Sequence, residues 1–306
     1  MAYFVLKRLR QGILSLAGIV LLVFVLARLT GSPARLYLPE EATQEIVDAF
    51  NAAHGFDGPI IVQLWDYILG VLTLNFGESI MYGQPALDVV MSRYGATLAL
   101  AAWTMLFAVV LGIIFGVASA SRPGSFRDGL TRVGSLTALS VPDFWVAIMG
   151  ITVFSVALGI LPTSGVGGIE YWILPLFVLL LRPLGMLTQV VRNSMLSVLD
   201  SDYVRVARAK GVSRQAILYK HALRNAAIPV LTVAGVLAAQ VVNGALVIET
   251  IFGWPGVGNL MVTSIRGRDF AVIQTVVLVT GAAIILLNLM IDIVYSWINP
   301  QIRLEA

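Results

Sequence analysis

Six long apolar runs divide this chain, and they constrain its fold more than any other feature. Pro142 interrupts the third run; the six cover about 13–29, 96–120, 133–160, 171–191, 227–250 and 271–296. Each run is long enough to cross the ~30 Å hydrocarbon layer of a bilayer as an α-helix. A spanning segment must satisfy its own backbone hydrogen bonds, and helices do so. The chain is therefore predicted to be an all-α, polytopic membrane protein with six transmembrane helices.

Composition agrees with this fold and argues against several kinds of site. The 306 residues are 58% hydrophobic and 12% charged, with a mean hydropathy of +0.89, far from the average of soluble domains. There is no cysteine, and the two histidines lie far apart, so we expect no metal site. None of the lysines (Lys7, Lys210, Lys220) follows a glycine, as a phosphate-binding loop requires. We predict no cofactor in this chain and no nucleic acid as a partner, so any ATPase, with its ATP and Mg²⁺, must be a separate subunit.

The basic residues predict the orientation. If the amino terminus, the 121–132 turn, the 192–226 segment and the tail face the cytoplasm, most of the 20 Lys and Arg lie there, as is usual for inner faces. Both termini are then cytoplasmic. The acidic segment 31–95 faces outward, where it either contacts a partner or caps the vestibule. Its apolar part, 60–74, is predicted to lie on the membrane surface or to pack on the helices.

These assignments divide the chain into three parts. Residues 1–30 form an amino-terminal tail with the first transmembrane helix, and residues 31–95 form an extracytoplasmic segment. Residues 96–300 form a core of five helices, with a cytoplasmic loop at about 200–226. The three parts belong to one membrane domain.

The longest basic segment, 202–229, is predicted to fold as two short amphipathic helices. Helical spacing places Tyr203, Val206, Ala207 and Lys210 on one face and Arg205 and Arg208 on another. Gly211 is predicted to end the first helix in a left-handed cap, and Ser213 to begin the second. The second presents Ile217, Leu218 and Ala222, and Asn225 and Pro229 are predicted to mark the turn into the fifth span. Such a pair either docks on another protein or lies on anionic lipid.

Polar residues inside the spans are candidates for a transport pathway because burying them in lipid is costly. Arg182 either meets a substrate carboxylate, extends to the interface or pairs with Asp143. Gln240 and Asn243 lie about one turn apart and either face a cavity or hydrogen-bond a neighbouring helix. Trp254, followed by Pro255, is predicted to anchor the chain at the outer interface.

Several motifs, in order along the chain, resemble those of ATP-binding-cassette (ABC) importer permeases of the dipeptide, oligopeptide and nickel family. The best match is the basic segment, in which Arg205 and Val206 replace the Glu and Ala of the wider permease pattern, as is usual in this family. The matching residues are Tyr3-x4-Arg8-x-Arg10, Asp57-x-Pro59-x3-Gln63-x-Trp65, Phe76-Gly77-x-Ser79, Ser140-x-Pro142-x-Phe144-Trp145, Asp202-Tyr203-Val204-Arg205-x-Ala207-Arg208-Ala209-Lys210-Gly211, His221-Ala222-Leu223-Arg224-Asn225-Ala226 with Pro229, Glu249-x2-Phe252-x2-Pro255-Gly256-x-Gly258 and Arg268-Asp269-Phe270-x3-Gln274.

The resemblance implies a type I ABC importer permease, not an enzyme, in the bacterial inner membrane. Its implied partners are a second, different permease, two ATP-binding subunits, an extracytoplasmic binding protein and membrane lipid. The residues implied to couple the permease to the ATPase are Asp202, Tyr203, Arg205, Ala207, Arg208, Ala209, Lys210 and Gly211. The implied cargo is di- or oligopeptides, and nickel complexes and oligosaccharides stay open.

Two other classes of membrane protein fit the sequence less well than an ABC importer permease. A secondary transporter driven by an ion gradient is expected to show inverted repeats, and no convincing repeat is visible. A membrane-embedded enzyme needs paired Asp or a Ser/His group within the bilayer, whereas both histidines fall outside the predicted spans.

Overall fold

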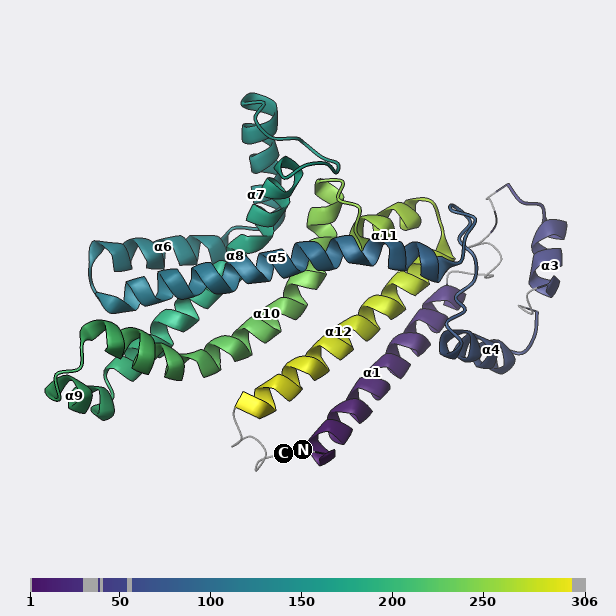
Figure 1. Ribbon diagram of the computed structural model, residues 1–306. Coiled ribbons are helices and arrows are strands. Elements are labelled where there is room, and N and C mark those ends of the chain that lie inside the picture. Colours follow the sequence, from purple (N-terminus) through teal and green to yellow (C-terminus); the bar gives the residue numbers. More distant parts are fainter. Residues whose placement is uncertain (1, 30–37, 39–40, 54–56, 299–306) are drawn as a thin grey trace. The chain divides into compact units, whose positions relative to one another are not determined.

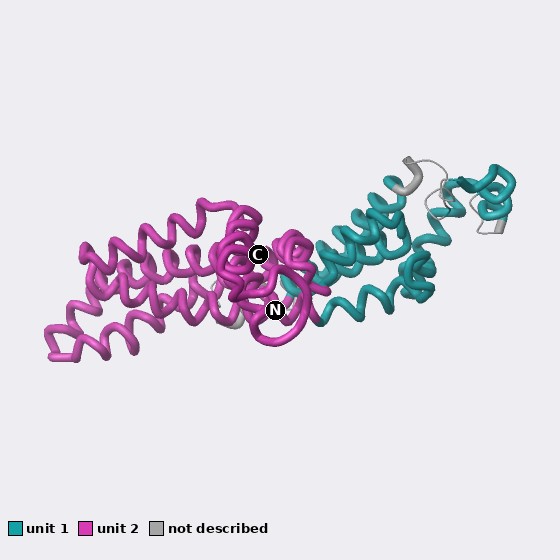
Figure 2. Tube along the Cα trace, turned by 90° about the horizontal axis from the view of Figure 1, so that it is seen from above, with its two compact units in different colours: residues 1–95, 256–289 teal, residues 96–255, 290–306 magenta. Residues whose placement is uncertain are grey.

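The computed structural model describes residues 2–29, 38, 41–53 and 57–298, and they separate into two compact units (Figures 1 and 2). One unit comprises residues 1–95 and 256–289, and the other comprises 96–255 and 290–306. His54, Arg35 and the predicted tail after residue 298 lie outside the described residues.

The first unit gathers the amino-terminal and carboxy-terminal spans around one apolar cluster. Val20 of the first helix, Val90 and Val272 belong to this cluster. The elements of the unit are α1 (Ala2–Leu29), α3 (Gln44–Ala53), α4 (Ile60–Leu72), the start of α5 (Ala86–Ser121), α11 (Val257–Arg266) and most of α12 (Phe270–Ile298).

The predicted amphipathic stretch 60–74 is the helix α4, and its two faces differ. Tyr67, Ile68 and Val71 pack against the apolar cluster of the first unit, next to α1. Ile61 and Leu72 on other sides of the helix stay more than 70% exposed. One face of α4 therefore packs on the helices of its unit, while apolar side chains elsewhere on it remain uncovered.

The second unit is built on α8, which packs against α6, α7 and α10. Two apolar clusters fill it, one around Leu187 and Val191 and another around Val178 and Ile248. Its elements are the rest of α5, α6 (Phe126–Ser140), α7 (Asp143–Gly150), the π-helical segment η1 (Ile151–Ala157), α8 (Glu170–Leu199), α9 (Asp202–Ala209), the π-helical segment η2 (Ala216–Ala222), α10 (Leu223–Ile251) and the end of α12.

Two glycines one turn apart set how closely α5 approaches α8. A Cβ atom at Gly112 would lie 2.9 Å from Cβ of Leu187, and one at Gly116 would lie 2.5 Å from Cβ of Val191. Real Cβ atoms do not come so close, so only glycine permits this contact. The Gly-x3-Gly spacing places both on one face, as at close helix crossings in membranes.

Within the described residues, five helices are long and apolar enough to cross a membrane, and a sixth span is counted if a bent pair is one span. That pair is α6 followed by α7 and η1, bent by 99° at the break, where Pro142 precedes the first residue of α7. The predicted interruption of the third run at Pro142 is confirmed. The reason is local, since proline restricts the residue before it to extended backbone.

Candidate functional site

The predicted first helix of the basic segment is α9, and it ends as the glycine predicts. Gly211 has φ +78°, a conformation that favours glycine. Its N–H donates to the carbonyl of Arg208 at 3.0 Å, and the N–H of Val212 donates to that of Ala207 at 3.1 Å. This pair of bonds is a Schellman cap. The segment therefore stops abruptly and presents a compact helix of two turns.

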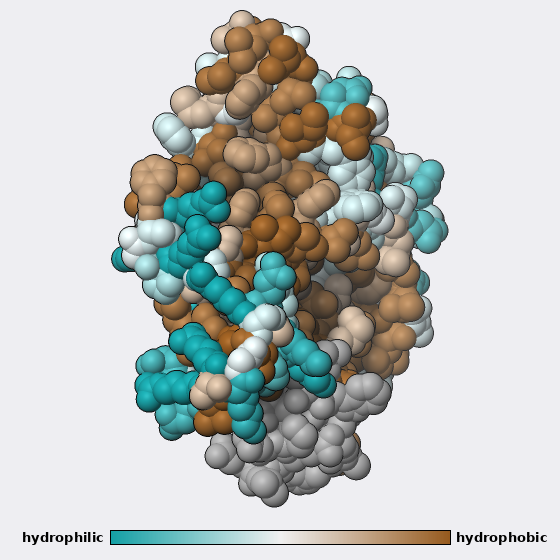
Figure 3. All heavy atoms as spheres, turned by 60° about the vertical axis from the view of Figure 1, so that its left-hand side comes forward, coloured by the Kyte–Doolittle hydropathy of each residue, from teal (hydrophilic) through white to brown (hydrophobic). Residues whose placement is uncertain are grey.

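The surface of α9 is a mixture of apolar and charged side chains. Val204 is completely buried and Ala207 partly so, and they are the side chains through which the helix packs. Tyr203 and Val206 are exposed, as are the cationic residues and Ala209. Hydrophilic side chains gather over α9 and its neighbouring turns, beside a largely apolar surface (Figure 3). An exposed patch with apolar and cationic groups side by side suits docking to a protein.

The second predicted helix is present but does not turn before the membrane span. Ser213 accepts from the N–H of Ala216 at 3.4 Å, and the buried side chains of η2 include Ile217 and Leu218. The prediction that Asn225 and Pro229 mark a turn is wrong, because η2 continues directly into α10. A proline removes one N–H and bends a helix, but surrounding packing can keep the helix continuous.

Asn225 has a different role from the one predicted. Its Nδ2 donates to Oη of Tyr203 at 2.6 Å, which ties α10 to α9. Helix α9 also follows α8 after a short turn, with the N–H of Arg205 donating to the carbonyl of Ser201. Helix α9 is therefore joined to α8 through the chain and to α10 through this hydrogen bond.

Arg205, the position at which the chain departs from the wider permease pattern, pairs within its own segment. Its guanidinium lies 3.4 Å from Oδ1 of Asp200 and 3.3 Å from Oδ1 of Asp202. All three side chains are largely exposed, so water screens the pairs and they are easily exchanged for other partners. The coupling role that the resemblance implies for Arg205 stays a prediction.

A buried ion pair, which sequence reasoning missed, holds the neighbouring helix ends together. Arg192 of α8 donates to both carboxylate oxygens of Asp128 in α6, at 2.7 and 3.0 Å. Ser119 of α5 and the N–H of Gly124 donate to the same carboxylate. The sequence places Arg192 among the basic residues of the cytoplasmic 192–226 segment, but only 16% of its side chain is exposed. A signal was present, because Ser125 and Asp128 have capping-box spacing, and Ser125 does accept from the N–H of Asp128.

The candidate pathway residues lie on two different helices of the second unit. Arg182 pairs with Asp143, with Nε 3.7 Å from Oδ2, and its side chain is half exposed. Gln240 and Asn243 are exposed on one face of α10, together with Val236. In the described part of the chain neither amide bonds a neighbouring helix. The predicted pathway role of Gln240 and Asn243 stays a prediction.

The predicted interfacial anchor Trp254 is instead a core residue. It is 3% exposed, its ring lies edge-on to Trp172 at 4.5 Å, and its Nε1 donates to the carbonyl of Ala96 at 3.2 Å. The prediction of an anchor is wrong because the residues after α10 fold back onto the helices. Beside it, Oγ1 of Thr97 donates to Oε1 of the buried Glu249 at 2.7 Å.

In the first unit, two distant motifs meet in a buried polar cluster around Asp269. Its carboxylate accepts from the hydroxyl of Ser79, from the N–H of Met81 at 3.2 Å and from the N–H of Val272 at 3.3 Å. Gln274 Nε2 donates to the carbonyl of Phe76 at 3.1 Å. This cluster fixes the end of the 31–95 segment against the start of α12.

The fold is that of a polytopic helical membrane protein, and comparisons with known proteins place it in a family. Residues 108–304 match the family of binding-protein-dependent transport system inner membrane components. The chain is 39% identical to the glutathione transport system permease protein GsiC of Salmonella typhimurium and 38% identical to GsiC of Escherichia coli K12, covering 99% of each chain. The chain belongs to this family and is an ABC importer permease of its peptide, oligopeptide and nickel branch, a transport component rather than an enzyme.

Solved structures support the fold. A crystal form of the MetNI methionine ABC transporter, described as inward facing, contains a chain that superposes with a TM-score of 0.57 at 17% identity. The match covers 69% of this chain and 96% of that chain. A second crystal form of the same transporter gives a TM-score of 0.56 at 18% identity. The all-α fold predicted from the apolar runs and the permease fold implied by the family resemblance are both confirmed.

Proposed function

We propose that this permease forms one half of a translocation pathway for short peptides or peptide-like solutes. The observation that carries the proposal is the 39% identity over 99% of the chain to a glutathione permease, since glutathione is a small peptide. Nickel complexes and oligosaccharides are the alternative cargoes. A binding protein delivers the cargo, so the permease itself needs little affinity for it.

The proposed machine contains a second, different permease, two ATP-binding subunits and an extracytoplasmic binding protein, in the bacterial inner membrane. Both termini and α9 face the cytoplasm, residues 31–95 face outward, and residues 96–300 form the core. The surface of α9 meets the ATPase, with contributions from Asp202, Tyr203, Arg205, Ala207, Arg208, Ala209, Lys210 and Gly211. Because α9 is joined to α8 and is tied to α10 through Asn225, ATP-driven closure moves both helices as a body. Arg182, Gln240 and Asn243 are the proposed pathway residues.

The test is co-purification of the tagged chain from mild detergent, with the associated proteins identified by mass spectrometry. Gly211→Pro should lose the ATPase subunits, because proline cannot adopt φ +78°. Gly159→Pro is the matched control, since Gly159 also has a positive φ, of +63°, and no neighbour within 4 Å of its added Cβ. Val206→Glu places a charge on the exposed face of α9 and should weaken the same association without straining the backbone.

Transport into proteoliposomes containing the whole complex tests the mechanism and the cargo. Uptake of a labelled tripeptide should require ATP and the binding protein, and Val206→Glu should reduce it. Uptake that continues without ATP and follows an imposed ion gradient would contradict the proposal and favour a secondary transporter. ATP-dependent uptake of a nickel complex or an oligosaccharide, with no peptide uptake, would contradict the cargo alone.

A further inference from the structure

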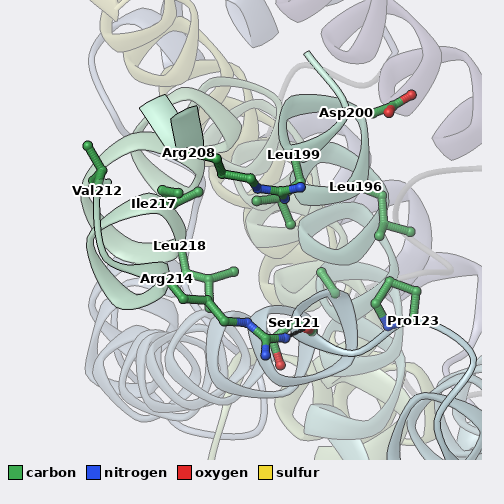
Figure 4. A pocket seen from close by; sticks show the side chains of 11 residues that line it. Ser121, Pro123, Leu196, Leu199, Asp200, Arg208, Val212, Arg214, Ile217 and Leu218 are labelled. Atoms are coloured by element: carbon green, nitrogen blue, oxygen red, sulfur yellow. Dashed lines mark hydrogen bonds between the residues drawn. The ribbon is translucent and has the colours of Figure 1, made fainter. Parts of the chain in front are cut away.

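Two adjoining hollows lie near the ends of α5 and α8 and the start of η2. The larger, of about 660 Å³, lies between the last residues of α5, those of α8 and the loop after α9 (Figure 4). The smaller, of about 410 Å³, lies between α5 and η2. Ser121, Arg214 and Leu218 line both hollows, so Arg214 stands where they meet.

The guanidinium of Arg214 is positioned for an anion. It donates to the backbone carbonyl of Ser121, which uses only part of its five N–H donors. Figure 4 shows Arg208 and Arg214 both extending inward from the α9 side, while the carboxylate of Asp200 points away. Asp200 accepts from Arg205 instead. Arg208 and Arg214 therefore line one hollow, and the carboxylate of Asp200, which also lines it, is paired with Arg205.

The smaller hollow has a charged end and an apolar wall. Arg122 and Arg214 line it near the end of α5, and Ile113, Ile114 and Ala118 line it along the same helix. Ile114 is 53% exposed. Because α5 is one of the candidate membrane spans, this wall leads from the surface of the bilayer toward its hydrocarbon. Cations at the membrane surface above an apolar groove fit an amphiphile with an anionic head.

We propose that these hollows bind one anionic phospholipid. Its phosphate lies between Arg122 and Arg214, and one acyl chain follows α5 past Ile114 and Ala118. The apolar wall favours a lipid over a partner protein, since a spanning helix presents this surface to acyl chains. The bound lipid bridges the end of α5 and the start of η2, the segment that continues into α10. The inference concerns a lipid site and does not depend on which cargo is transported.

The experiment is native mass spectrometry of the full-length chain, with whichever subunits co-purify, titrated with phosphatidylglycerol or phosphatidylcholine. Phosphatidylglycerol should be retained preferentially. Arg122→Gln and Arg214→Gln should each weaken it about fivefold, from the ~1 kcal/mol that one cation contributes near a membrane surface. Arg132→Gln, which removes an exposed cation outside the hollows, is the matched control and should leave binding unchanged. Ala118→Trp keeps every charge, fills the groove and should also reduce binding.

Four results would overturn the proposal. Equal losses with Arg132→Gln would mean unspecific attraction, and full retention by Ala118→Trp would mean that no acyl chain lies in the groove. Displacement of the lipid by an equal concentration of inorganic phosphate would assign the site to free phosphate. Release of ATPase subunits by Arg122→Gln, with lipid binding unchanged, would assign it to the ATPase. Because Arg122 is exposed, its substitution tests the site even if Arg214→Gln fails to fold.

Discussion

Two arginine–aspartate ion pairs in the second unit have the same chemistry but differ in burial and in role. Arg192 donates hydrogen bonds to both carboxylate oxygens of Asp128, whose side chain is 3% exposed. Arg205 reaches Asp200 and Asp202 by single contacts beyond 3.2 Å, and both carboxylates are almost fully exposed. Removing one partner of a buried pair leaves a charge without compensation, whereas an exposed charge returns to water. The Arg192–Asp128 pair therefore holds α8 against α6. We expect the exposed contacts of Arg205 to be exchanged readily for contacts with another subunit.

Asp128→Ala should produce the largest loss of stability, because it leaves the partly buried Arg192 beside Ser119 without a carboxylate. We expect the free energy of unfolding to fall by about 3 kcal/mol. Thermal unfolding of the detergent-solubilised protein measures it. Asp200→Ala is the matched control and should change stability little. Equal effects of the two substitutions would contradict the distinction between the pairs.

Replacing both members of the buried pair should cost less than the sum of the single changes. Asp128→Leu combined with Arg192→Met removes both charges together, so neither is left uncompensated. A double-mutant cycle on the same unfolding measurement should give a coupling energy of roughly 1–3 kcal/mol. Strict additivity would mean that the two side chains act independently.

Asp269→Ala extends the comparison to a buried acid held by neutral donors. It leaves the hydroxyl of Ser79 and the N–H groups of Met81 and Val272 without this acceptor, which should cost roughly 2–3 kcal/mol. Limited proteolysis within the 76–85 segment should speed up, since the cluster fixes that segment. Asp88→Ala is the control, because Asp88 lies just after this segment, in the first turn of α5 and outside the cluster. Unchanged proteolysis in Asp269→Ala would show that the cluster does not hold the segment.

Arg205→Gln should give the smallest change in stability, at most about 1 kcal/mol, since both of its partners are exposed. Its effect should appear in association with the ATPase, which should weaken and become less sensitive to salt. Binding of purified ATPase subunits at two salt concentrations measures this. A large fall in stability with unchanged association would reverse the roles assigned to the two pairs.

Local signals in the sequence predicted much of this structure correctly. Gly211 ends α9 because no other residue adopts its backbone so readily, and Pro142 separates α6 from α7 because it restricts its neighbour. The turn predicted at Pro229 was wrong, because the effect of a proline depends on what packs around the helix. The membrane-interface anchor predicted at Trp254 was also wrong, because an aromatic residue near the end of a span suits either the membrane interface or the protein core.

The sequence by itself determined that this is a membrane protein, which segments form apolar helices and where the basic segment lies. It could do so because hydropathy and capping act over one or two turns. Only the tertiary structure decided which charges are buried. Arg192 and Asp128 lie 64 residues apart, and Ser79 and Asp269 lie 190 apart. Nothing local distinguishes Arg192 from Arg205, since each is a cation within a helix. The packing of α8 against α6 removes one from water and leaves the other on the surface.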